Sequence, residues 1–299
     1  MRLLPLFALL ASAAANRADD DWYVARNRAT VEAIYNLTVF PNNVPILQHL
    51  AAAIPPGIFN DSVVGRVTPA GAFVGLDDSL EYFFGLSVPV PPAYTGFSKS
   101  NVVQFTSGCP EVAASTVYLE TSAFDPVNPR YNISYLKEFA FWRFDETGAV
   151  LAYDAWLPNL SAWIADVAGT DIYAPAVQAG SIYGICAGVQ DRCTGPNQQY
   201  GSVEECIGVL SQKTYGNYDE TWGDNVVCRS IHLLLTASRP DVHCPHVGPT
   251  GGGKCVDGSY VEKYFGDQAL FGKTSLELFN CPEKSPAKSD KHSKKKYGY

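Results

Sequence analysis

Residues 66–75 read RVTPAGAFVG and residues 79–86 read SLEYFFGL, so a turn-rich run is followed by an aromatic one. In the first run, β-branched residues flank Pro-Ala-Gly, which is typical of a short β-hairpin. Before the second run, Asp77-Asp78-Ser79 supplies N-cap residues for a helix. We therefore predict a hairpin over 63–75, and then a helix with an apolar side of Leu80, Phe83, Phe84 and Leu86.

Helices are predicted before this hairpin and strands after it. Apolar residues recur at helical spacing from about residue 19 to Val39, and a shorter helix fits Val44–Ile54. Prolines follow both segments and end them. Four later segments favour strands: Val102–Thr106, Val112–Phe124, Tyr135–Phe144 and Ala149–Leu157.

The last two strands flank Asp-Glu-Thr-Gly at residues 145–148, a turn of hairpin length. Side chains alternate across a strand, so Phe139, Phe141 and Arg143 should share one face. Trp142 and Phe144 should share the other. An antiparallel sheet is therefore expected after three helices.

This order of helices, hairpin and strand meander resembles the NTF2-like superfamily, which includes SnoaL-like cyclases and ketosteroid isomerases. The resemblance rests on residues 66–75, 79–86 and 139–149, and it covers about residues 20–165. It implies an α+β fold in which helices pack on a curved antiparallel sheet to form a cone. Members of the family hold small, mostly apolar molecules in this cone and differ in chemistry, so the resemblance implies a pocket but no particular reaction.

Polar and aromatic residues of this half are candidates for the pocket wall. Four of them are predicted to contact a ligand if the strand phase turns them inward: Tyr35, Tyr118, Trp142 and Arg143. Asp154 is the candidate general base, with Tyr35 or Tyr118 as the hydroxyl donor. His49 is a second candidate base because imidazole titrates near neutral pH, although a surface histidine is the simpler interpretation.

Cysteines divide the chain, because seven of the eight lie between residues 186 and 281. We place the junction at residues 168–180, which separates an NTF2-like domain at 16–168 from a Cys-rich, mainly helical domain at 180–282. Two helices are predicted there, at 202–210 and 225–235, and a bridge between their cysteines is expected. No family is identified for this half.

An even number of cysteines in an exported chain predicts disulfide bonds. The eight are Cys109, Cys186, Cys193, Cys206, Cys228, Cys244, Cys255 and Cys281. The spacing does not choose among the possible pairings. If all eight pair, Cys109 must bond a cysteine of the second half, and we predict Cys281.

Three of the five histidines, His232, His243 and His246, fall within fifteen residues. Three imidazoles suffice to hold zinc or copper, which makes them a candidate metal site. Against this, His-x-x-His is expected on a Pro-containing loop rather than at the i, i+4 spacing of a helical zinc motif. In the alternative interpretation, which requires no cofactor, these rings cap helix ends and hydrogen-bond to the backbone.

The termini and the sequons predict a secreted glycoprotein. Residues 1–15 have the basic, apolar and small-residue order of a signal peptide, and no later apolar run is long enough to span a membrane. Residues 283–299 are rich in lysine and are expected to be disordered; the simpler interpretation is a solvated tail without a partner, and the alternative is a tail that binds an anionic surface or polysaccharide. Four Asn-x-Ser/Thr sequons are candidate glycosylation sites: Asn36, Asn60, Asn132 and Asn159.

The function expected from these features is the extracellular binding of a small apolar molecule without catalysis. The net charge of −8 argues against a nucleic-acid partner, which clustered basic groups would bind. Two alternatives remain open. One is a lyase, isomerase or hydrolase that uses the pocket residues Asp154, His49 or Tyr35, and the other is a metal-dependent site on the three histidines.

Overall fold

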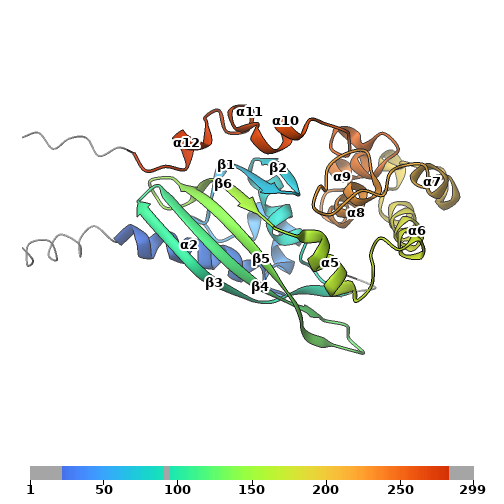
Figure 1. The fold of residues 1–299 in the computed structure, drawn as a ribbon, viewed down its shortest axis with the longest axis horizontal. Helices are drawn as coiled ribbons and strands as arrows, with labels where there is room; N and C mark the ends of the chain where they lie inside the picture. Colours follow the sequence, from blue (N-terminus) through green and yellow to red (C-terminus); the bar gives the residue numbers. More distant parts are fainter. Residues whose placement is uncertain (1–21, 91–93, 283–299) are drawn as a thin grey trace, which may run out of the picture.

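A curved, six-stranded mixed sheet forms the centre of the molecule in the computed structural model, which describes residues 22–90 and 94–282 (Figure 1). The strand order is β2-β1-β6-β5-β4-β3, with β1 and β6 parallel and the other neighbours antiparallel. The strands are β1 Phe59–Thr68, β2 Gly71–Val74, β3 Thr95–Cys109, β4 Val112–Ala123, β5 Arg130–Phe144 and β6 Val150–Trp156. The predicted signal peptide and lysine-rich tail lie outside the described residues.

Helices of the first half cover the inner face of this sheet, and the fold is the expected α+β cone. The longest of them, α2, packs against β3, and the hydroxyl of its Tyr35 donates a hydrogen bond to Glu138 on β5. The first-half helices are α2 Trp22–Thr38, α3 Val44–His49, the 3-10 turn η1 Leu50–Ala52, α4 Leu76–Leu80, the π-helix η2 Glu81–Gly85 and α5 Leu160–Ala168. The predicted hairpin is present as β1–β2, with Val64 opposite Val74.

Burial alternates along β5 as the sequence predicts for a strand with one wet face. Trp142 and Phe144 are buried on the inner face, whereas Phe139 and Phe141 are exposed on the outer one. Tyr153 of β6 packs beside Trp142 and lies over Gly65, where a Cβ would come within 2.0 Å of the Tyr153 ring. These side chains therefore form part of a tightly packed aromatic core on the inner face of the sheet.

The second half is a group of helices held by three internal disulfides. Its elements are α6 Pro175–Arg192, η3 Gly195–Asn197, α7 Val203–Leu210, α8 Val226–Leu235, α9 Pro240–Val247 and η4 Gly251–Gly253. The expected bridge between α7 and α8 is absent. Cys206 of α7 bonds Cys186 of α6, and Cys228 of α8 bonds Cys255, because α6 lies against α7 and residues 251–255 fold back beside α8.

The last described segment returns along the sheet. Its helices α10 Tyr260–Phe265, α11 Asp267–Phe271 and α12 Ser275–Leu278 run from the α8–α9 group back past β1 (Figure 1). The predicted Cys109–Cys281 bond is present and fixes the end of this segment to β3. Among the described residues, no helix is long and apolar enough to cross a membrane.

Candidate functional site

A cavity of about 230 Å³ lies between the inner face of the sheet and the helices. Its wall is mostly apolar, with Phe97 and Leu136 from the sheet and Trp163 from α5. Helix α8 of the second half closes one side with Ile231 and Leu234. The Cys-rich half therefore completes the cone pocket.

The polar feature of this pocket is a paired carboxyl and phenol. The hydroxyl of Tyr35 donates to Oε1 of Glu138 over 2.8 Å, and both side chains are buried. Burial raises the pKa of Glu138 to about 7, against the opposing effect of the Tyr35 hydrogen bond. Burial and the neighbouring carboxyl hold the pKa of Tyr35 well above its ordinary value. Glu138 can therefore gain or lose a proton near neutral pH while Tyr35 remains a donor.

Of the predicted ligand contacts, Tyr35 lines the pocket and the others do not. Trp142 is on the inner face but is packed in the core, where its indole nitrogen donates to Ser115 Oγ over 2.9 Å. Tyr118 is 39% exposed on the outer face, and Arg143 reaches the carbonyl of Leu278 in the returning segment. Those two predictions are wrong because they assume the opposite strand phase.

The predicted bases also lie outside the pocket. Asp154 is on the outer face, where Arg66 donates Nε to its Oδ1 over 3.0 Å. His49 is exposed at the end of α3. The residue that sequence reasoning missed is Glu138, which has the same strand parity as Trp142 and Phe144. A charged residue on a face otherwise filled by Leu136, Ala140 and these aromatics is the pattern that could have revealed it.

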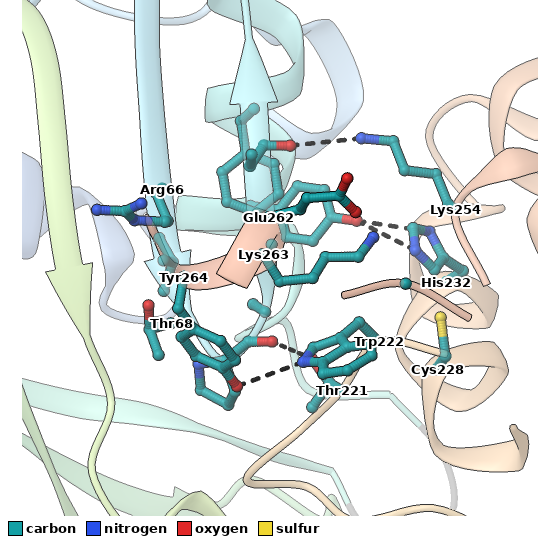
Figure 2. A pocket seen from close by; sticks show the side chains of 18 of the residues that line it. Arg66, Thr68, Thr221, Trp222, Cys228, His232, Lys254, Glu262, Lys263 and Tyr264 are labelled. Atoms are coloured by element: carbon teal, nitrogen blue, oxygen red, sulfur yellow. Dashed lines mark hydrogen bonds between the residues drawn. The ribbon is translucent and has the colours of Figure 1, made fainter. Parts of the chain in front are cut away.

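A second, polar cleft of about 450 Å³ (Figure 2) lies beside the cone pocket, and Tyr82 lines both. Figure 2 shows Lys254 and Lys263 on its wall near His232, and Thr221 and Trp222 at its far end. Tyr82 borders both this cleft and the cone pocket, so the two cavities are neighbours.

The three predicted histidines form one buried cluster beside this cleft. His232 Nδ1 lies 3.3 Å from His243 Nδ1 and 3.2 Å from His246 Nδ1. Contrary to expectation, His243 and His246 are on a helix, α9, in spite of Pro245. Burial, followed by the charges of neighbouring groups, keeps the pKa of His232 well below its ordinary value and lowers that of His246 to about 4.

Glu81 of η2 holds this cluster from the first half of the chain. Its Oε2 lies 2.9 Å from His243 Nε2, and it also accepts hydrogen bonds from Ser238 and Arg239. Burial alone would raise the pKa of Glu81, but these hydrogen bonds outweigh burial and lower it to about 2. In the described structure the histidine rings bond to one another, to Tyr82 and to Glu81 rather than to the backbone, so the capping interpretation does not describe them.

Adjacent residues of the π-helix η2 contact each of these sites. A π-helix has a wider turn than an α-helix, so its successive side chains point in other directions than those of an α-helix. Glu81 contacts the histidine cluster, Tyr82 separates the two cavities and Phe83 lines the cone pocket. Three adjacent residues therefore serve three neighbouring sites.

The fold and pocket define the chain as an α+β protein with an NTF2-like cone, extended by a disulfide-bonded helical region. The model of the BfoA family C-terminal domain matches residues 150–258, which begin in β6 and include much of the second half, for which the sequence suggested no family. This match contains all three clustered histidines.

Relatives of similar length are found in fungi. The chain is 28% identical to aurasperone B biosynthesis cluster protein A of Aspergillus niger over 82% of this chain and 86% of the relative. It is also 28% identical to bifonsecin B biosynthesis cluster protein A of Aspergillus brasiliensis over 82% of this chain and 88% of that one. A solved structure from Jannaschia, described as a SnoaL-like polyketide cyclase, matches 49% of this chain and 94% of its own length with a TM-score of 0.33 and 13% identity.

Proposed function

We propose that the protein is an enzyme of secondary metabolism that moves a proton on a small apolar molecule in the cone pocket. The observation that carries this proposal is Glu138, a buried carboxyl with a pKa of about 7 on the wall of an apolar cavity. The names of the fungal relatives, which refer to biosynthesis clusters, support the metabolic setting.

Glu138 acts as the general acid–base and Tyr35 as its positioning partner. The carboxylate removes a proton from an acidic C–H or O–H of the ligand, and the resulting carboxylic acid returns it at another atom. The Tyr35 hydroxyl holds Oε1 in place over 2.8 Å and stabilises the charged form. Apolar walls exclude water, which strengthens this interaction. An isomerisation, dehydration or ring closure that begins with loss of such a proton fits this arrangement.

We also propose that the protein works after export. The eight cysteines all form disulfides, as is typical of oxidising compartments. The sequon residues Asn36, Asn132 and Asn159 are exposed and open to glycosylation, whereas Asn60 is half-buried and donates to Asp145.

The test uses 1-phenylbutane-1,3-dione as a probe with an acidic C–H. Deuterium uptake in D₂O is followed by NMR, and binding by quenching of Trp163, which lines the pocket. We expect Glu138→Gln to bind the probe as the wild type does and to lose about 100-fold or more of the protein-catalysed uptake. Glu146→Gln, an identical change on an exposed turn, should retain both.

The pH dependence adds a second readout. Because the carboxylate is the base, uptake should rise with pH through about 7 in the wild type, and this step should be absent in Glu138→Gln. Full activity of Glu138→Gln would refute the assignment. Probe binding by the wild type without any uptake would favour the binding protein that the sequence suggested.

A further inference from the structure

We propose that His232, His243 and His246 bind one zinc ion at the junction of the two halves. The proposal is independent of the reaction at Glu138, because the cluster lies on the cleft side of Tyr82. It rests on the spacing of the ring nitrogens, on the hydrogen-bonding capacity of imidazole and on a buried carboxylate behind one ring.

The spacing of the nitrogens matches zinc coordination. Nitrogen ligands at about 2.0–2.1 Å from a tetrahedral zinc lie roughly 3.3 Å from one another. The two Nδ1–Nδ1 separations from His232 are 3.3 and 3.2 Å. The ligand atoms of all three rings lie within 4.8 Å of one another. One ion between them can therefore reach every ring.

Hydrogen bonds among the three rings do not satisfy all of their facing nitrogens. The carboxylate of Glu81 accepts from His243 Nε2, which leaves His243 Nδ1 as a lone pair facing His232. His232 Nδ1 has two imidazole nitrogens at hydrogen-bond distance but carries at most one proton. A cation at the centre satisfies three lone pairs at once.

Glu81 supplies the support that metal-binding histidines usually have. A carboxylate on the far nitrogen fixes the tautomer and raises the basicity of the ligating nitrogen. Glu81 is fully buried, and Ser238 and Arg239 hold its two oxygens in place. Asp78 also contacts Arg239 over 2.7 Å, so the Arg239 guanidinium is shared by the carboxylates of Asp78 and Glu81.

His232 and Tyr82 both line the polar cleft, so a fourth ligand could reach the cluster from that side. The Tyr82 hydroxyl lies 3.5 Å from His232 Nδ1, at a separation similar to that of the other rings. Cys228 and Cys255 are also close to His232, but their disulfide removes them as ligands. Zinc would thus join α8 to α9, and the Glu81–His243 hydrogen bond would connect this site to η2 of the first half.

The experiment uses the full chain purified without a histidine tag, stripped with chelator and reloaded with ZnSO₄ or CuSO₄ in separate arms. We expect about one zinc per chain by elemental analysis, and an increase in melting temperature with zinc. His243→Asn and His246→Asn should lose tight binding, whereas His49→Asn, a matched change at an exposed histidine, should retain it.

A variant at Glu81 and a cobalt spectrum test the site without relying on variants that could fail to fold. Glu81→Gln should still bind one zinc at saturation but about 10–100-fold more weakly, as expected for loss of a supporting carboxylate. Wild-type protein loaded with Co²⁺ should show the visible d–d bands of a tetrahedral nitrogen site. Folded wild-type protein that retains no stoichiometric zinc, or that binds copper but not zinc, would overturn the proposal.

Discussion

The two halves of the molecule reach a stable fold by different means. The first buries a large aromatic core between a curved sheet and α2, and its one disulfide joins it to the returning C-terminal segment. The second surrounds a smaller core, and four of its ten buried residues are the disulfide cysteines Cys186, Cys193, Cys206 and Cys244. A sheet that buries many apolar side chains is stable enough to enclose a cavity and a buried carboxyl. Helices that bury few apolar side chains depend more on covalent links for their stability.

The largest expected effect tests the aromatic core of the first half. Trp142→Ala removes a fully buried indole and leaves the Ser115 hydroxyl without its partner, so we expect a loss of about 5 kcal/mol in the free energy of unfolding. Trp156→Ala, at a tryptophan that is 57% exposed on the same sheet, should cost much less. Denaturant unfolding of both variants checks this, and equal losses would show that the inner face is not the main source of stability.

The next effect tests the covalent links of the second half. Replacing Cys193 and Cys244 by alanine opens a loop of 51 residues, so we expect a loss of about 4 kcal/mol. Hydrogen exchange should accelerate in α6–α9 and remain slow in β4 and β5. The Cys186/Cys206 double variant opens a loop of 20 residues and should show a smaller change. Equal acceleration in the sheet would mean that the halves unfold together.

The smallest effect concerns the carboxyl that the first half encloses. The pKa of Glu138 is raised from 4.5 to about 7, so the folded state holds its proton more tightly than the unfolded chain. This proton stabilises the fold fully below pH 4.5, and the contribution is lost as pH rises through 7. Glu138→Gln should therefore match the wild type near pH 4 and exceed it by up to about 3 kcal/mol at pH 8. Parallel denaturant titrations at both values decide this, and a difference that does not depend on pH would contradict it.

Local patterns predicted the elements of the fold but not every detail of the site. The hairpin at 63–75, the strand at 135–144 and the helices at 202–210 and 225–235 depend on neighbouring residues, and all are present. Counting predicted that Cys109 bonds a cysteine of the second half, and the partner chosen for it, Cys281, is the one that the structure shows. By contrast, an error of one residue in strand phase exchanges the side chains that face the pocket with those that face solvent. The prediction therefore placed Tyr118 and Arg143 in the pocket and did not identify Glu138.

The remaining site features are long-range and have no local pattern. Glu81 meets His243 across 162 positions of chain, and Ile231 closes a pocket whose wall is built from residues far before it. Such contacts arise from the way the halves dock. The helical setting of His243 and His246 was also missed, because Pro245 favours a loop in the sequence, whereas packing of α9 on α8 holds it in a helix.

Because η2 (Glu81–Gly85) is a π-helix, the directions of its side chains depend on the exact number of residues in this segment. Deleting a single residue there would restore ordinary helical geometry and rotate the flanking side chains by roughly 100° relative to each other. A carboxylate, a phenol and a phenyl ring would all change direction together. Length in this segment is thus as constrained as residue identity.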